Sequence, residues 1–267
     1  MIRLTSFQTL ARTPFTVVLM VISYNFLIAC SDSDTNLTLS IEGENYNILV
    51  FSKTSGWRHD SIEAGKIALT KLATENKFGI TITEDASHFT VENLEGYDSV
   101  IFLNTTETVF NDDQRGAFKQ YIQSGGGFVG IHSATDTEYG WPWYNKLAGA
   151  YFASHPNNPN VRSAVIEVTD KNHPATKMLP DRWERQDEWY NFQDFNEDVH
   201  VLMYLDTNSY EGSAHPGNHP IAWYHEYDGG RAFYTALGHT SESFEEELFL
   251  EHLWGGIQYA MGLEKPE

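Results

Sequence analysis

The chain has 267 residues, of which 41% are hydrophobic and 14% aromatic, so it can bury a large core and is not globally disordered. Its formal net charge of -20 argues against nucleic-acid binding and against adsorption on anionic lipid, because both depend on Lys and Arg. The charge sets no limit on a neutral ligand such as a sugar. We expect no nucleotide cofactor, since the chain has neither a Walker sequence nor Gly-x-Gly-x-x-Gly.

Residues 1–29 predict a lipoprotein signal peptide. Arg3 and Arg12 supply positive charge, and the uncharged apolar segment 15–28 is too short for a comfortable membrane span. The sequence Leu27-Ile28-Ala29-Cys30 resembles a bacterial lipobox, in which cleavage precedes a lipid-modified cysteine, although Ile28 replaces the usual small residue. We therefore expect an exported bacterial lipoprotein, periplasmic or at the cell surface, that touches the membrane only through its lipid anchor. An ordinary signal peptide followed by a chance cysteine is the alternative.

Cys30 is the only cysteine in the chain, so after lipidation the protein has no thiol left. Disulfides, thiolate metal ligands and a cysteine nucleophile are then all excluded. Residues 30–45 are polar and predict a tether, and residues 46–263 predict one α/β domain.

The first half of this domain alternates strands with helices. Short apolar or β-branched runs predict strands at 46–52, 79–84, 97–103 and 127–131, and helical spacing predicts helices at 61–76 and 111–124. This alternation predicts a mostly parallel sheet with helices on its faces. Residues 135–160 are rich in aromatics, Pro, Asn and Gly and predict long loops with a short helix at 144–149.

The second half predicts strands at 161–168, 199–205, 221–227 and 231–236, with a closing helix at 243–262. Asp228-Gly229-Gly230 is a hairpin turn signal. No internal repeat is present, and nothing in the sequence indicates a linker inside the domain.

Several histidines follow predicted strands, which is where open α/β sheets bind ligands. Arg58 and His59 lie in a glycine-bearing loop between the first strand and the first helix, where backbone N–H groups and the helix dipole favour an anion or hydroxyl. A solvated loop would give the same pattern. His239 follows the strand at 231–236 and is favoured as a site residue over a core imidazole.

His132 directly follows a strand that ends in small residues, an arrangement resembling a nucleophile elbow. We expect His132 to be a ligand, acid or base. Ser133 is a less favoured nucleophile, because the Gly-x-Ser-x-Gly spacing is absent.

Three further segments supply candidates. His155 lies in the aromatic loop region and could equally be a solvated loop residue. Glu188 and Trp189 belong to Asp187-Glu188-Trp189-Tyr190, in which acids beside aromatics are typical of carbohydrate sites, although a solvated acid pair is the alternative. His215 and His219 have metal-like spacing on a Pro/Gly loop, and His219 is the better site candidate.

Five motifs in order give a family resemblance: Ser55-Gly-Trp-Arg-His-Asp-Ser-Ile62, Gly125-Gly-Gly-Phe-Val-Gly-Ile-His-Ser-Ala134, Asp187-Glu-Trp-Tyr190, His219-Pro-Ile-Ala-Trp223 and Arg231-Ala-Phe-Tyr-Thr-Ala-Leu-Gly-His239. Together they resemble the trehalose-utilisation, ThuA-like family over about residues 46–262. The resemblance implies a flavodoxin-like, class I glutamine amidotransferase-like fold with added β-hairpins, and a link to disaccharides, including 3-keto-glycoside derivatives.

Amidotransferases of this superfamily have a cysteine where this chain has His132. Without a thiolate the acyl-enzyme route is closed, so we expect no glutaminase activity.

The favoured hypothesis is an enzyme acting on a disaccharide or keto-sugar. In it His132, Glu188 and His239 act as acid–base groups, and Arg58, His59, Ser133, His155, Trp189 and His219 contact the substrate. Alternatively His132, His155, Glu188 and His239 bind a divalent metal such as zinc, because imidazoles with one carboxylate suit that ion. A non-catalytic surface carbohydrate-binding protein is the competing hypothesis.

Overall fold

The structure is a computed structural model that describes residues 38–43, 45–215 and 217–266. The predicted signal peptide and Cys30 lie outside the described residues. The strands are β1 Leu39–Ile41, β2 Asn47–Phe51, β3 Gly79–Thr83, β4 Ser99–Leu103, β5 Gly127–Ile131, β6 Tyr151–Ser154, β7 Val161–Val168, β8 Arg182–Glu188, β9 Asn191–Gln193, β10 His200–Leu205, β11 His219–Tyr227 and β12 Gly230–Thr235. The helices are α1 Ile62–Asn76, α2 Val91–Leu94, α3 Asp112–Gln123, α4 Pro142–Ala148 and α5 Glu247–Met261.

Ten strands form one sheet in the order β1-β3-β2-β4-β5-β12-β11-β10-β7-β8, and β6 pairs with β9 separately. The five neighbours β3, β2, β4, β5 and β12 run parallel, and the remaining pairings of the large sheet are antiparallel. The parallel strands are buried on both faces, which explains their nearly continuous apolar sequences. The chain therefore has the mixed α/β architecture expected from its alternating pattern.

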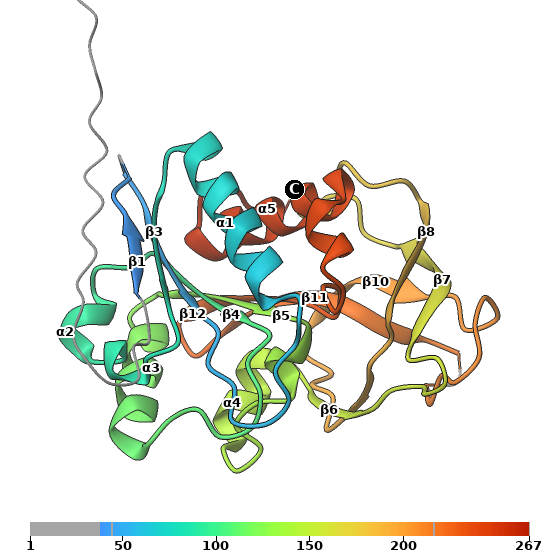
Figure 1. Cartoon of the computed structure of the whole chain (residues 1–267), viewed down its shortest axis with the longest axis horizontal. Coiled ribbons are helices and arrows are strands. Elements are labelled where there is room, and N and C mark those ends of the chain that lie inside the picture. The colour runs from blue at the N-terminus through green and yellow to red at the C-terminus, as the bar shows by residue number, and fades with distance from the viewer. Residues whose placement is uncertain (1–37, 44, 216, 267) are drawn as a thin grey trace, which may run out of the picture. The chain divides into compact units, whose positions relative to one another are not determined.

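Helices cover both faces of the sheet (Figure 1). The helices α1 and α5 lie together on one face, and α2, α3 and α4 lie on the other. The helix α3 begins with a capping box, in which the Asn111 side chain and the Gln114 side chain each accept from the other's backbone N–H. In the described part of the chain, no helix has the length and apolar character needed to cross a membrane.

Five elements were not predicted from the sequence: β1, α2, β6, β8 and β9. Residues 39–41 lie in the predicted tether, but they form β1 and pair antiparallel with β3. The edge of the sheet supplies backbone partners for this short segment, and the Ser40 hydroxyl lies 3.1 Å from that of Thr81.

The strand β8 was not predicted. Its buried positions include the charged residues Arg185 and Asp187, so the usual alternation of apolar and polar residues is hidden. These two residues form an ion pair with each other at 3.2 Å.

The antiparallel half bends back toward the carboxyl ends of the parallel strands. In a flat sheet β8 would lie about 19 Å from β12, since four strand spacings of about 4.8 Å separate them. In the structure Asp187 of β8 accepts hydrogen bonds from the backbone N–H groups of Gly238 and His239, just after β12. Register shifts between β10 and β11 accompany this bend, as bulges commonly do.

Candidate functional site

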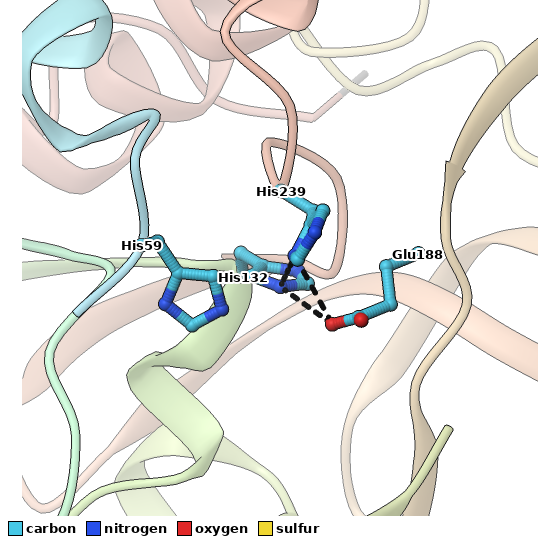
Figure 2. Close-up of side chains that lie close together, drawn as sticks. All are labelled: His59, His132, Glu188 and His239. Carbon is cyan, nitrogen blue, oxygen red and sulfur yellow. Dashed lines mark hydrogen bonds and ion pairs between the residues drawn. The ribbon is translucent and has the colours of Figure 1, made fainter. Parts of the chain in front are cut away.

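Three histidines and one glutamate from four distant segments meet at the carboxyl ends of the parallel strands (Figure 2). His59 follows β2, His132 follows β5 and His239 follows β12, whereas Glu188 ends β8. One ligand atom from each residue can be chosen so that all four lie within 4.8 Å of one another. We call these four residues the polar cluster.

His132 is held in an uncommon backbone conformation. Its φ of 49° is left-handed, and the chain turns there from β5 into a 3₁₀ turn, as at a nucleophile elbow. Such a residue costs on the order of 1–3 kcal/mol, which surrounding contacts must offset. The Nδ1–H donates to the Ala236 carbonyl at 2.8 Å, and the Tyr234 hydroxyl donates to the His132 carbonyl at 2.7 Å. Because Nδ1 carries the proton, Nε2 presents a lone pair to the cluster when the ring is neutral.

His239 is positioned by a loop that Asp187 organises. Gly238 has a φ of 106°, which favours glycine, and both its N–H and that of His239 point to the Asp187 carboxylate at 3.0 and 3.1 Å. The His239 Nδ1 then lies 3.2 Å from Nε2 of His132 and 3.1 Å from Oε2 of Glu188. Burial lowers the pKa of His239, but the hydrogen bond and charge of Glu188 outweigh burial, so the pKa is raised overall.

Glu188 is a buried carboxylate with partners on both oxygens. Its Oε2 lies between His132 and His239, and its Oε1 accepts from the Asn160 amide at 2.7 Å. Burial alone would raise the pKa of Glu188, but the hydrogen bonds from both histidines lower it well below its ordinary value. Glu188 is therefore ionised at neutral pH.

His59 completes the polar cluster from the opposite side. It is buried, and its ring stands edge-on to the rings of both His132 and His239, at centroid distances of 4.9 and 5.2 Å. Burial and the neighbouring histidines lower its pKa to about 2, so the ring is neutral. Its nitrogens face the Ser133 hydroxyl at 3.4 Å and the Tyr190 hydroxyl at 3.5 Å. Ser133 is fully buried and follows His132 in the 3₁₀ turn.

A cavity of about 460 Å³ opens onto the polar cluster. Trp57 stands at this cavity with 73% of its surface exposed. Among the described residues that line the cavity, several are acidic or aromatic and none is Lys or Arg. The lining residues are Trp57, His59, Asp60, Asp136, Phe152, His155, Asn160, Glu188, Tyr190 and His239.

Four of the expected substrate contacts are not among the residues that line this cavity: Arg58, Ser133, Trp189 and His219. The Arg58 guanidinium instead binds both carboxylate oxygens of Glu84 and also pairs with Glu63. Trp189 is fully buried, and its indole N–H donates to the Arg162 carbonyl, because successive residues at the end of a strand face opposite sides.

His219 begins β11 and is fully buried rather than lying in a loop. Its Nε2–H donates to the Tyr190 carbonyl at 2.7 Å, so His219 supports a cavity residue from behind. Its Nδ1 lies 2.8 Å from the Tyr210 hydroxyl.

The residues that could hold a metal ion differ from the expected set by one histidine. His155 lines the cavity, and its Nδ1 lies 3.4 Å from Oε1 of Glu188, but it is not part of the polar cluster. His59 occupies that place. The aromatic loop carries His155 to the outer side of Glu188, whereas the loop after β2 brings His59 inside.

Three residues of the polar cluster have ligand atoms spaced as in a zinc-type site. Ligand atoms around a tetrahedral zinc lie about 3.3 Å apart when the bonds are about 2.0 Å. His132 Nε2, His239 Nδ1 and Glu188 Oε2 are separated by 3.1, 3.2 and 3.5 Å. The lone pair of His132 faces a carboxylate, a contact that a cation or a shared proton stabilises.

Sequence reasoning missed several cavity residues. Trp57 and Tyr190 lie inside motifs that were singled out, and their aromatic character was the available signal. Asp136, Phe152 and Asn160 come from the aromatic, Pro-rich and Asn-rich region, where no regular pattern indicates which side chains face inward.

Comparisons with known proteins agree with the motifs. A ThuA-like protein from Bacteroides uniformis has a TM-score of 0.68 and 25% identity, covering 82% of this chain and 93% of that chain. A ThuA-like protein from Parabacteroides merdae has a TM-score of 0.66 and 20% identity, covering 82% and 90%. A search of curated proteins found no match. The model of the ThuA family, described as trehalose utilisation, matches residues 47–260, and the chain belongs to this family.

Proposed function

We propose that this protein is an enzyme acting on a disaccharide or keto-sugar derivative, with the polar cluster as its active site. The observation that carries the proposal is the convergence of His132, His239 and Glu188, whose facing atoms lie 3.1 to 3.5 Å apart beside a cavity. Ionisable groups with displaced pKa values that meet in a cleft are typical of catalytic sites.

The cavity lining supports a neutral sugar as the ligand. Trp57, Phe152 and Tyr190 offer aromatic faces for the C–H side of a sugar ring, and Asn160 and the carboxylates offer hydrogen-bond partners for hydroxyl groups. A phosphorylated or carboxylated sugar fits poorly, because the lining acids repel anions and no Lys or Arg is among the lining residues.

The chemistry supported by these groups is polarisation of a carbonyl or hydroxyl oxygen together with proton transfer. A divalent metal held by His132, Glu188 and His239, with His59 as a fourth donor, would supply a Lewis acid. The residues themselves orient the sugar and exclude water. In the metal-free alternative, His239, whose pKa is raised, donates a proton or a hydrogen bond to an oxygen on which negative charge develops.

The test combines turnover with metal analysis. Protein purified without a histidine tag is incubated with 3-keto-trehalose and 3-keto-glucose, and products are followed by NMR. We expect turnover by the wild type and loss of turnover in His132→Ala. Equal turnover by both proteins would contradict the proposal, and turnover by metal-free protein would restrict it to acid–base chemistry.

The competing function is carbohydrate binding without catalysis, favoured by the exposed Trp57 at the cavity. Binding alone predicts that Trp57→Ala weakens sugar affinity, that His132→Ala retains it, and that neither protein converts any keto-sugar. Calorimetry with trehalose and its 3-keto derivative distinguishes the two functions.

We also propose that the parallel half of the sheet is flavodoxin-like and amidotransferase-like, extended by antiparallel hairpins. In chain order its five parallel strands are arranged 2-1-3-4-5, the order found in flavodoxin-like folds, and β11 and β12 are joined through Asp228 and Gly229. We expect no glutaminase activity, because His132 replaces the nucleophilic cysteine of that superfamily. Ammonia release from glutamine by the purified protein would overturn this expectation.

Export as a lipoprotein anchored through Cys30 is a further proposal, and it is supported by the sequence of residues 1–30 alone. Labelling of cells with a radioactive fatty acid should mark the wild-type protein and not Cys30→Ala. Equal labelling of the two proteins would contradict it.

A further inference from the structure

We propose that Asp136 and Tyr139 form a proton-exchanging pair on the cavity wall, in which Asp136 is a second acid–base residue that acts on the bound sugar. This inference depends on the proposed function, because it assigns a further catalytic residue to the same cavity. Asp136 lines that cavity and ends the 3₁₀ turn that His132 begins after β5, but it is not a member of the polar cluster.

The Tyr139 hydroxyl has two acceptors within reach and one proton to give. It lies 2.5 Å from Oδ1 of Asp136 and 3.1 Å from the Phe152 carbonyl. When Asp136 is ionised, Tyr139 donates to the carboxylate, and 2.5 Å is typical of such a charge-assisted bond. When Asp136 is neutral, the carboxyl O–H can donate to the Tyr139 oxygen while Tyr139 donates to the Phe152 carbonyl. Rotation of the Tyr139 hydroxyl therefore provides a hydrogen bond for both the ionised and the neutral form of Asp136.

Neither state leaves a polar group unpaired in this network. The Phe152 carbonyl also accepts from the Gln193 side-chain amide at 3.1 Å, so it keeps a partner when Tyr139 turns to Asp136. A carboxyl whose two protonation states are both satisfied can take up and release a proton without side-chain rearrangement, as an acid–base group requires.

The electrostatic surroundings make Asp136 easier to protonate than an ordinary aspartate. Tyr139, Glu107, His132 and His155 are the titratable groups with the largest effects on the pKa of Asp136, and Tyr190 and Tyr234 also interact with its charge. Burial and the charge of Glu107 raise the pKa of Asp136, and they outweigh Tyr139 and the two histidines, which lower it. Glu188 is shifted in the opposite direction. Two carboxyl groups of one cavity with pKa values displaced in opposite directions are a pattern of acid–base sites.

The proton transfer can be written for a keto-sugar. The ionised Asp136 takes the proton from the carbon beside the ketone, and the electron pair of that C–H bond moves to the ketone oxygen to give an enolate. Asp136 is then a neutral carboxylic acid. Return of the proton to carbon restores both the ketone and the carboxylate, so atoms and charge balance.

The test follows loss of the ring C–H signals of 3-keto-glucose in D₂O by NMR, across a range of pH. We expect Asp136→Asn to slow exchange about 10²- to 10⁴-fold and to abolish the acid limb of the profile. Tyr139→Phe should move that limb to higher pH, because the carboxylate loses its donor, while the plateau rate is largely kept. Asp113→Asn, on the exposed side of α3, removes the same charge and should leave the profile unchanged. Exchange in Asp136→Asn at the wild-type rate would overturn the inference.

A second measurement separates this inference from the proposed function. Carbon-13 NMR of protein labelled at the aspartate carboxyl carbons should show a group that is absent in Asp136→Asn and titrates above the ordinary range, and higher still in Tyr139→Phe. An ordinary pKa with no response to Tyr139→Phe overturns the pair whatever the turnover. If the titration is as expected but the wild type exchanges nothing, the keto-sugar function fails, and the catalytic role of Asp136 fails with it.

Discussion

Two groups of buried histidines in this protein have different surroundings. His132 and His239 face the carboxylate of Glu188, and His239 also lines the cavity. His173 and His252 instead lie in the core among Tyr224, Phe233 and other aromatic rings. In the core pair each Nδ1 bonds to the backbone of Ala175, and each Nε2 has no partner among the described residues. Burial of histidines alone therefore does not indicate a functional site. The polar cluster differs from the core pair by its carboxylate, by its mutually facing lone pairs and by its access to solvent.

The largest expected effect comes from Glu188→Gln. This change keeps the shape of the side chain and can keep its contact with Asn160, but it removes the negative charge that His132 and His239 both face. We expect turnover of 3-keto-glycosides to fall about 10²- to 10⁴-fold and the pKa of His239 to fall, as measured by kinetics and by histidine NMR titration. Glu184→Gln on the exposed face of β8 is the matched control. Full activity in Glu188→Gln would remove the distinction between the two histidine groups.

The second prediction compares metal binding in the two groups. His132→Ala removes a facing lone pair, so zinc affinity should fall by more than about 100-fold, whereas His252→Leu should leave it unchanged. Calorimetry and metal analysis of untagged protein measure both variants. Equal affinities would show that zinc is bound elsewhere or nonspecifically.

Part of the folding stability that is lost at low pH should come from the core pair, His173 and His252. Burial lowers the pKa of His173 to about 3 and that of His252 to about 4, whereas the unfolded chain titrates near 6.5. The unfolded state therefore binds more protons, and stability present above about pH 6.5 is lost as the pH falls toward 4, by about 1.4 kcal/mol per pKa unit.

The variant His252→Leu removes one of these groups. Urea unfolding should show a smaller loss of stability between pH 7 and pH 4 than in the wild type. At pH 7 the variant should be about 1 kcal/mol less stable, because the Ala175 carbonyl loses its donor. An unchanged pH dependence would assign the acid sensitivity to other groups, Glu188 among them.

The smallest effect is expected for Arg58→Gln, which lies beside His59 in sequence but outside the cavity. Its side chain is 44% exposed, and Glu84 retains Lys66 as a partner. We expect a stability loss below about 1 kcal/mol that disappears in high salt, with unchanged sugar affinity. A large rise in KM would place Arg58 back in the substrate site.

The sequence predicted most of the parallel half of the fold, because strands buried on both faces leave continuous apolar runs, as in β2, β4 and β5. It failed for β8, where the buried charges Arg185 and Asp187 obscure the period, and for β1, whose pairing depends on the edge of β3. From the sequence, Trp189 was predicted as a substrate contact, whereas Tyr190 lines the cavity. Both residues are aromatic, so only the direction of each side chain in the structure separates them.

The sequence by itself determined that His59, His132 and His239 lie at one edge of the sheet, because the carboxyl ends of parallel strands meet there. Only the tertiary structure decided that Glu188 joins them, since β8 is four strands away from β12 and the bend of the antiparallel half brings it back. It also placed His59 rather than His155 in the polar cluster and brought Asp136 into the cavity. Residue order fixes where a strand ends, but curvature and loop packing fix which side chains then share a cavity.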